Sequence, residues 1–213
     1  MITQITGFLI LIFWFLNLFF FKMDFNPQFE PYLPPPKIIQ HLTAGFNVQA
    51  ADSLWLRAVQ DFDYCDQQKD TGNECQGKSW LFSVLDVAST LDKKLEPVMY
   101  QSGGLALTII ISDYDGASVI FDRGVEVYPK NWQLVYAAAY HALYEEKNKL
   151  KAAKLYQMAA ENGAPEWIHA MAGRLAIEGG HNEYAKKVLE DLIAQNKDEN
   201  IIKRLKEKLK GIK

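Results

Sequence analysis

Hydrophobic residues form one continuous run near the amino-terminal end, before any periodic pattern begins. Residues 6–21 read TGFLILIFWFLNLFFF and contain no charged side chain. As a helix this run would rise about 24 Å, which approaches the thickness of a bilayer core. No Lys or Arg precedes it and no small-residue exit follows it, which argues against a cleaved signal peptide. A buried core helix would need a polar face that the run lacks, so we expect an uncleaved membrane anchor over residues 1–22.

A proline-rich segment, residues 23–48, follows the expected anchor. It contains five of the chain's eight prolines, and Pro34, Pro35 and Pro36 are consecutive. Consecutive prolines favour the stiff, extended polyproline II conformation. We expect a spacer that holds the rest of the chain away from the membrane. A docking ligand and a lead-in that packs on the following domain are the alternatives.

Beyond the linker the apolar residues follow a helical period, and one pattern recurs along the chain. It consists of a small residue, three others, a large apolar residue, two others and a second small residue. Its copies begin 36, 35 and 33 positions apart; the first copy has Leu in place of its first small residue, and the fourth has Leu in place of its second. The four copies are Leu81, Leu85, Ala88; Ala117, Phe121, Gly124; Ala152, Tyr156, Ala159; and Ala185, Leu189, Leu192.

Each copy of the pattern has a physical explanation as the second helix of a pair. Offsets of four and three residues place its members on one helix face, where small residues let another helix approach closely. A first helix precedes each copy, at residues 50–64, 97–112, 132–145 and 165–178. Residues 108–111 are β-branched enough for a strand, but their place in the repeat predicts a buried helix. Such pairs cover their apolar faces by stacking on their neighbours.

This arrangement resembles the tetratricopeptide repeat, a helix pair of about 34 residues. The resemblance covers residues 50–196 and is clearest in the second helices, with Gly173 and Ala185 at matching positions. The segments LPPPK and ADSLWLRAVQDF are also similar to those of membrane-anchored bacterial repeat proteins. The resemblance implies an all-α protein, with a solenoid of about four helix pairs within residues 49–213.

The carboxyl-terminal segment, residues 197–213, is basic and amphipathic. It contains seven Lys or Arg residues and three acidic residues, a net charge of +4. Ile201, Ile202, Leu205 and Leu209 fall on one helical face. We expect a capping helix that is apolar inside and solvated outside. A surface for anionic lipid or for an acidic partner is the alternative.

A solenoid of this kind presents a concave face that is lined by its first helices. Aromatic and Arg side chains on this face are the residue types that anchor protein partners. Three of the candidates could equally lie in the core between repeats; these are Leu134, Met99 and Trp167. The candidate groove residues are Met99, Ser102, Leu134, His141, Tyr144, Trp167 and Arg174.

The composition of the chain argues against several classes of protein. The chain has 213 residues, a net charge of −3 and 49% hydrophobic residues, as an ordinary globular protein does. No net positive field attracts phosphate, so we expect no nucleic-acid partner. Only residues 6–21 are apolar enough to cross a bilayer, so a multi-span membrane protein is excluded.

The two cysteines, Cys65 and Cys75, have nine residues between them and lie within one polar insertion. A disulfide there would close a short loop and stabilise it by about 2.5–3 kcal/mol, whereas two free thiols are the alternative. A disulfide implies an oxidising compartment. Lys22 and Lys37 favour a cytoplasmic domain under the positive-inside rule, but we give the cysteines more weight. We therefore expect a single-pass protein of a bacterial inner membrane with its repeat domain in the periplasm.

No catalytic motif occurs in the chain: it lacks a nucleophile elbow, a phosphate loop, a dinucleotide fingerprint and a zinc-hydrolase helix. The four histidines are scattered, which argues against a zinc site. The spacing of the acidic residues in the insertion does not fit a calcium loop. We expect no enzymatic activity, cofactor, metal or small-molecule substrate. The acidic residues of the insertion are Asp61, Asp63, Asp66, Asp70 and Glu74.

These features together favour a membrane-anchored scaffold that binds a protein or peptide partner in its groove and organises a membrane-associated complex. A structural subunit buried in a larger membrane assembly is the first alternative. An extracytoplasmic enzyme that uses the acidic insertion is the second.

Overall fold

A computed structural model describes residues 35–60, 77–195 and 197–211. These residues form helices joined by short turns, and no strand occurs among them, which confirms the all-α prediction. They belong to a compact unit that spans Leu33–Lys213. In the described part of the chain, no helix is both long and apolar enough to cross a membrane. The predicted anchor at residues 1–22 lies outside the described residues, as do Cys65, Cys75 and most of the acidic insertion.

The helices occur close to the predicted positions. A 3₁₀ helix, η1, and α2 come first, followed by helices in the order of the predicted pairs. The bounds are η1 Lys37–His41, α2 Asn47–Gln60, α3 Trp80–Leu91, α4 Pro97–Ala106, α5 Tyr114–Val127, α6 Trp132–Tyr144, α7 Lys149–Glu161, α8 Trp167–Glu178, α9 Asn182–Ala194 and α10 Glu199–Lys210, with a π-helix, η3 Leu107–Ile111, between α4 and α5.

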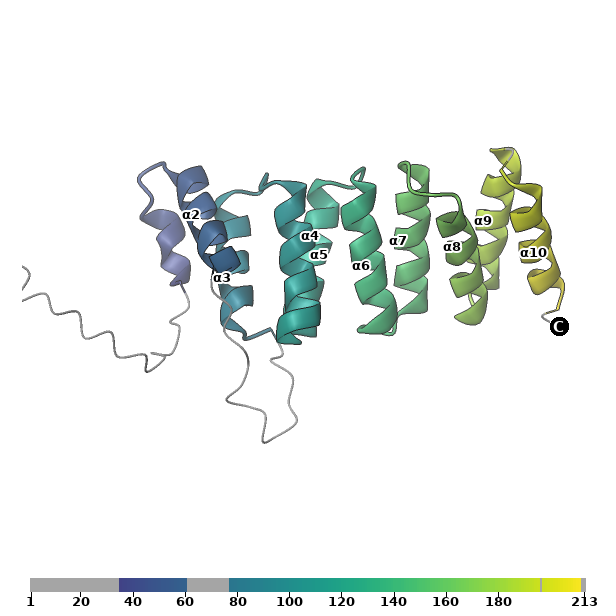
Figure 1. Ribbon diagram of the computed structural model, residues 1–213, viewed down its shortest axis with the longest axis horizontal. Helices are drawn as coiled ribbons and strands as arrows, with labels where there is room; N and C mark the ends of the chain where they lie inside the picture. The colour runs from purple at the N-terminus through teal and green to yellow at the C-terminus, as the bar shows by residue number, and fades with distance from the viewer. Residues whose placement is uncertain (1–34, 61–76, 196, 212–213) are drawn as a thin grey trace, which may run out of the picture. The chain divides into compact units, whose positions relative to one another are not determined.

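The helices pack in chain order. α2 packs on α3, α4 on α5 and α6, α6 on α7, α7 on α8, and α8 on α9 and α10. Figure 1 shows them side by side, from α2 to α10. Each helix therefore buries its apolar face against helices that are close to it in the sequence, as repeat proteins do.

The recurring small–large–small pattern forms the interior of this arrangement. Phe121 and Tyr156 are almost completely buried, and the small residues around them are inaccessible. Gly124 of α5 lies so close to α4 that an added Cβ would stand 2.7 Å from the Cβ of Tyr100. The small residues thus set the distance between helices, which is the role that the sequence pattern predicted.

Side-chain caps begin several of the helices. Asn131 accepts a hydrogen bond from the backbone N–H of Leu134 at the start of α6, and Asn148 does the same for Lys151 at the start of α7. Asp113 caps α5 through the N–H of Gly116. Such caps satisfy backbone donors that the helix itself cannot pair.

Asp113 also holds two helices together. Its fully buried carboxylate accepts hydrogen bonds from the backbone N–H groups of Gly77 at 2.5 Å and Ser79 at 3.1 Å, and from the Ser79 hydroxyl at 2.5 Å. Ser79 is in turn the cap of α3. One carboxylate therefore fixes the start of α3 to the start of α5, and buried donors satisfy its charge.

The end of the helix predicted at residues 97–112 differs from a regular α-helix. After Ala106 the chain widens into a π-turn, and Ser112 closes it with a φ of 61°. Thr108 and Ile111 point inward as predicted, whereas Ile109 is 68% exposed. The wider turn rotates the residues that follow, so the expected fully buried helix presents part of this apolar segment to solvent.

The carboxyl-terminal helix α10 packs on α8 and α9 with the predicted face. Leu205 is buried and belongs to a cluster with Val188 and Leu192 of α9. Ile201, Ile202 and Leu209 are half-buried, and the basic residues of α10 are exposed. At the opposite end of the described region, η1 lies within the segment predicted as linker and packs on α3. Its Lys37 forms an ion pair with Asp86 of α3 at 3.4 Å.

Candidate functional site

The predicted groove residues occupy two different environments. Tyr144, Trp167 and Arg174 are exposed, and Met99 and Ser102 are half-buried. Leu134 and His141 are buried to 99% or more. Leu134 therefore takes the alternative place in the core between repeats, and the prediction of His141 as a groove residue was wrong. Both point from α6 into its packing with α4 and α5, since Leu134 lies beside Gly124 and His141 bonds Thr108 and Ser118.

A cleft between α8 and α10 brings two of the predicted residues together. It has a volume of about 480 Å³. Trp167 and Arg174 line it from α8, with Ala170 and Met171 between them. The α10 side consists of Ile201, Arg204, Leu205 and Lys208.

The indole of Trp167 stands partly in solvent at the first residue of α8. It is 53% exposed, and its ring meets the ring of Tyr136 edge to face at 6.2 Å. Tyr136 in turn packs on buried Tyr156 at 5.4 Å. Aromatic packing therefore orients Trp167 without covering it, which leaves a large apolar surface for a partner.

An aromatic ridge on α6 continues the surface from Trp167. Tyr136, Tyr140 and Tyr144 follow one another at intervals of four residues, so they share a helix face. The rings of Tyr140 and Tyr144 lie 4.5 Å apart, and both side chains are exposed. The sequence prediction included Tyr144 but missed Tyr136 and Tyr140, although their spacing is visible in residues 132–145.

The cleft is electrostatically positive. Three of its lining residues, Arg174, Arg204 and Lys208, carry positive charge and none is acidic. Arg174 bonds Glu178 one helical turn away at 3.5 Å. Arg204 and Lys208 form no ion pair with the described residues. The sequence predicts a capping helix here, and it did not place these two cations in the groove.

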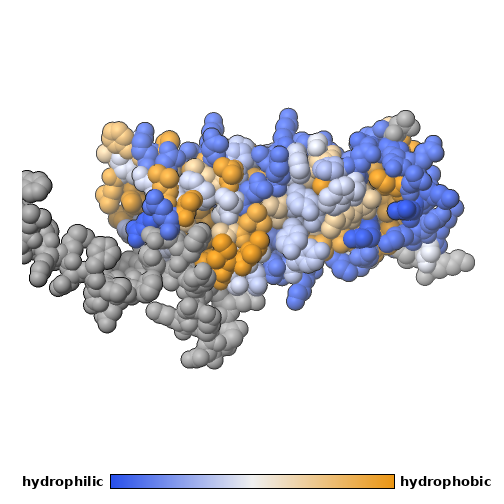
Figure 2. All heavy atoms as spheres, viewed as in Figure 1, coloured by the Kyte–Doolittle hydropathy of each residue, from blue (hydrophilic) through white to orange (hydrophobic). Residues whose placement is uncertain are grey.

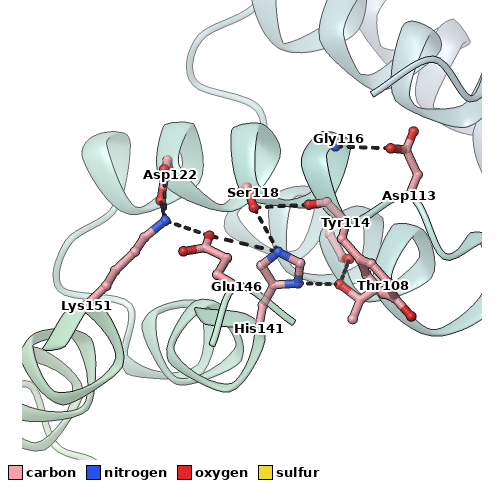
Figure 3. Close-up of polar contacts among 10 residues, drawn as sticks. Thr108, Asp113, Tyr114, Gly116, Ser118, Asp122, His141, Glu146 and Lys151 are labelled. Atoms are coloured by element: carbon pink, nitrogen blue, oxygen red, sulfur yellow. Dashed lines mark hydrogen bonds and ion pairs between the residues drawn. The ribbon is translucent and has the colours of Figure 1, made fainter. Parts of the chain in front are cut away.

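The most connected polar cluster lies deeper, around His141 (Figure 3). The ring Nδ1 is 2.9 Å from the hydroxyl of Thr108, and Nε2 is 2.9 Å from the hydroxyl of Ser118. These hydroxyls also lie within bonding distance of the carbonyls of Gly104 and Tyr114, at 2.9 Å and 3.0 Å. The imidazole thus joins the π-turn, α5 and α6.

Burial lowers the pKa of His141, although the nearby carboxylate of Glu146 acts in the opposite direction. A neutral ring has one donor and one acceptor nitrogen, so one of the two hydroxyls donates to it and the other accepts from it. The carboxylate of Glu146 is 4.0 Å from Nε2, the nitrogen that faces Ser118. A Ser–His–acid triad requires the acid on the opposite nitrogen, which here faces Thr108, so this cluster does not have triad geometry.

A chain of ion pairs connects the His141 cluster to the surface. The Nζ of Lys151 is 2.8 Å from Glu146 and 2.8 Å from Asp122 of α5. Burial works against the charge on Lys151, but its hydrogen bonds to Asp122 and Glu146 outweigh this effect and raise its pKa. These bonds tie α7 to α5 and to the turn after α6.

Metal and disulfide chemistry cannot be placed on the described residues. Among them, no three His, Cys, Asp or Glu side chains lie close enough together to hold a metal ion. Asp61, Asp63, Asp66, Asp70 and Glu74 belong to the insertion outside the described ranges.

In comparisons with known proteins, the chain matches no family model, no curated protein and no solved structure. The α8–α10 cleft and the aromatic ridge on α6 are therefore interpreted from their own geometry.

Proposed function

We propose that the protein is a membrane-anchored scaffold, similar to tetratricopeptide-repeat proteins, that binds a protein or peptide partner. In this proposal the helices form an α-solenoid, α10 is its cap, and residues 1–22 hold it in a bacterial inner membrane with the repeat domain in the periplasm. The chain-order packing of the helices and the uncharged run at residues 6–21 support it.

One observation carries the binding function. Trp167 remains half exposed at the entrance of a positive cleft, although Tyr136 orients its ring. A large aromatic side chain with a fixed orientation, next to Arg residues, is what protein interfaces use to anchor a partner. A partner segment would place an apolar side chain against Trp167 and acceptor groups near Arg174, Arg204 or Lys208.

Photo-crosslinking in intact cells tests this function. A photoreactive residue at Ala170, which lines the cleft, is expected to crosslink to one discrete protein, and Trp167→Ala is expected to abolish that product. The matched control is the same residue at Lys187, an exposed position on α9, where no product is expected. Equal crosslinking from both positions, or none from Ala170, contradicts the proposal.

The location of the domain has a separate test. Alkali extraction of membranes shows whether residues 1–22 anchor the chain. Thiol labelling of whole cells shows the compartment, because a Cys65–Cys75 disulfide is labelled only after reduction. Freely reactive thiols would place the domain in the cytoplasm. The binding function would then still be tested by the crosslinking experiment, which does not depend on the compartment.

A further inference from the structure

The outer face of α2 is apolar and uncovered. Val48, Leu56 and Val59 recur along this face at helical spacing, and each is at least half exposed. The buried residues Ala51 and Ala58 lie on an adjacent face of the helix. Phe46, just before the helix, extends the apolar surface and is 64% exposed. We call Val48, Asp52, Leu56 and Val59 the α2 stripe.

Within the described ranges, α2 has fewer packing neighbours than the helices in the middle of the chain. Its substantial contacts are with α3, whereas α4, α6 and α8 are each packed between neighbours. Seen from one side, apolar residues lie at the α2 end and over α4, whereas hydrophilic residues predominate at the α10 end (Figure 2). Repeat proteins keep their terminal faces polar, and exposed apolar patches mark interaction sites.

The α2 stripe contains one charged residue. Asp52 lies between Val48 and Leu56, is exposed, and forms no ion pair with the described residues. Gln49 and Gln60 flank the stripe with uncharged polar groups. A helix with an apolar stripe that contains a Lys or Arg opposite Asp52 would bury the apolar side chains and neutralise the carboxylate.

We propose that α2 is a docking surface for an amphipathic helix of a partner protein, with a basic residue in the middle of its apolar stripe. The partner helix would pack along the length of α2, whose 14 residues span about 21 Å. This interface is separate from the α8–α10 cleft and extends the proposed function to a second partner contact.

The position of Asp52 argues against the other occupants. A second copy that packs its α2 on this one around a two-fold axis would bring two Asp52 carboxylates together, since Asp52 lies near the middle of the helix. Like charges at such a position repel each other. A bilayer surface would bring the same carboxylate toward hydrocarbon, which is costly.

Two synthetic helical peptides test the proposal. Both peptides have the same apolar stripe. At its central position one peptide carries Lys and the other carries Glu. With the full chain in detergent, fluorescence anisotropy is expected to show about tenfold tighter binding of the Lys peptide, which corresponds to about 1.4 kcal/mol. Asp52→Lys is expected to reverse the preference, and Leu56→Ser is expected to weaken both peptides. Glu190→Lys, on exposed α9, is the matched control and leaves the preference unchanged.

Several results would overturn the docking surface. They are equal affinity for the two peptides, no binding of either peptide, and binding that Leu56→Ser does not weaken. Light scattering that shows a dimer dissociated by Leu56→Ser would assign the stripe to a second copy instead. A photoreactive residue at Leu56 that crosslinks only within the same chain would assign it to this chain's own residues. Trp167→Ala is expected to leave peptide binding intact, which separates this test from that of the cleft.

Discussion

Two glycines in different parts of the molecule leave no room for a Cβ atom, but they meet different neighbours. At Gly124, in the packing of α5 on α4, an added Cβ would stand 2.7 Å from the Cβ of Tyr100. At Gly173, in the packing of α8 on α10, it would stand 2.6 Å from the Cδ2 of Leu205. The first neighbour is the base of a buried side chain, whereas the second is the tip of a flexible one.

This difference separates a fixed interior from an adjustable end. Near Gly124 the backbone position itself is constrained, and Arg123 adds a bond to Asp86 at 2.9 Å across to α3. Near Gly173 a rotation of Leu205 can absorb a change in spacing. The positive cleft lies at this adjustable end, where small shifts of α10 alter its shape without disturbing the middle of the protein.

The largest expected effect is at the fixed junction. Gly124→Ala should lower the free energy of unfolding by about 2–3 kcal/mol, because the methyl group forces α4 and α5 apart. Urea denaturation followed by circular dichroism measures this change. Gly211→Ala, where an added Cβ meets only ordinary contacts, is the control and should change stability by less than about 0.5 kcal/mol. A Gly124→Ala variant as stable as this control would show that the junction is not fixed.

Acid should weaken the interior through its buried imidazole. Burial lowers the pKa of His141 in the folded state, so the unfolded chain binds a proton first as pH falls. The stabilising contribution is complete above the unfolded pKa, near pH 6.5, and is lost below it at up to about 1.4 kcal/mol per pH unit. Denaturation at pH 7.5 and pH 5.5 should show this loss, and His141→Gln should reduce it.

His169 gives the corresponding test at the adjustable end. Its pKa is also lowered, first by burial and then by the positive charge of Lys197, so its effect has the same sign. His169→Gln should therefore remove a further part of the pH dependence. Independence from pH in the unsubstituted protein would contradict the role of both rings.

A smaller effect is expected at the adjustable junction. Gly173→Ala should cost about 1 kcal/mol or less, because Leu205 can rotate away and Ala favours a helix more than Gly does. The same denaturation series measures it. A loss as large as that of Gly124→Ala would remove the distinction between the two junctions.

The smallest expected effect concerns the large residue of the repeat pattern. The hydroxyl of Tyr156 is buried and finds no hydrogen-bond partner among the described residues, and burial raises the pKa of this side chain. Tyr156→Phe keeps the ring and removes the unsatisfied group, so it should stabilise the protein by about 0.5 kcal/mol. Destabilisation by this substitution would show that the pattern depends on the hydroxyl and not on the volume of the ring.

The sequence predicted the helices and their small contact residues because both depend on local period and residue size. Ala117, Phe121 and Gly124 are buried as the pattern required. It did not predict which side of α6 faces inward, because α6 carries apolar and aromatic residues on most of its surface. His141 was therefore assigned to the groove, although its hydrogen bonds to Thr108 and Ser118 depend on contacts far apart in the sequence.

The candidate site was predicted only in part for a similar reason. Trp167 and Arg174 were identified from residue type and repeat position. Arg204 and Lys208 complete the cleft only because α10 lies beside α8, which charge and amphipathicity alone do not determine. The apolar stripe of α2 was missed because its residues read as the core face of an ordinary helix.

Hydrogen exchange measured by mass spectrometry distinguishes a fixed interior from an adjustable end, because it reports stability helix by helix. We expect Gly173→Ala to accelerate exchange in α10 and the facing part of α8 and to leave α4 to α6 protected. We expect Gly124→Ala to accelerate exchange across α4, α5 and α6. The same pattern of exchange in both variants would contradict a fixed interior with an adjustable, cleft-bearing end.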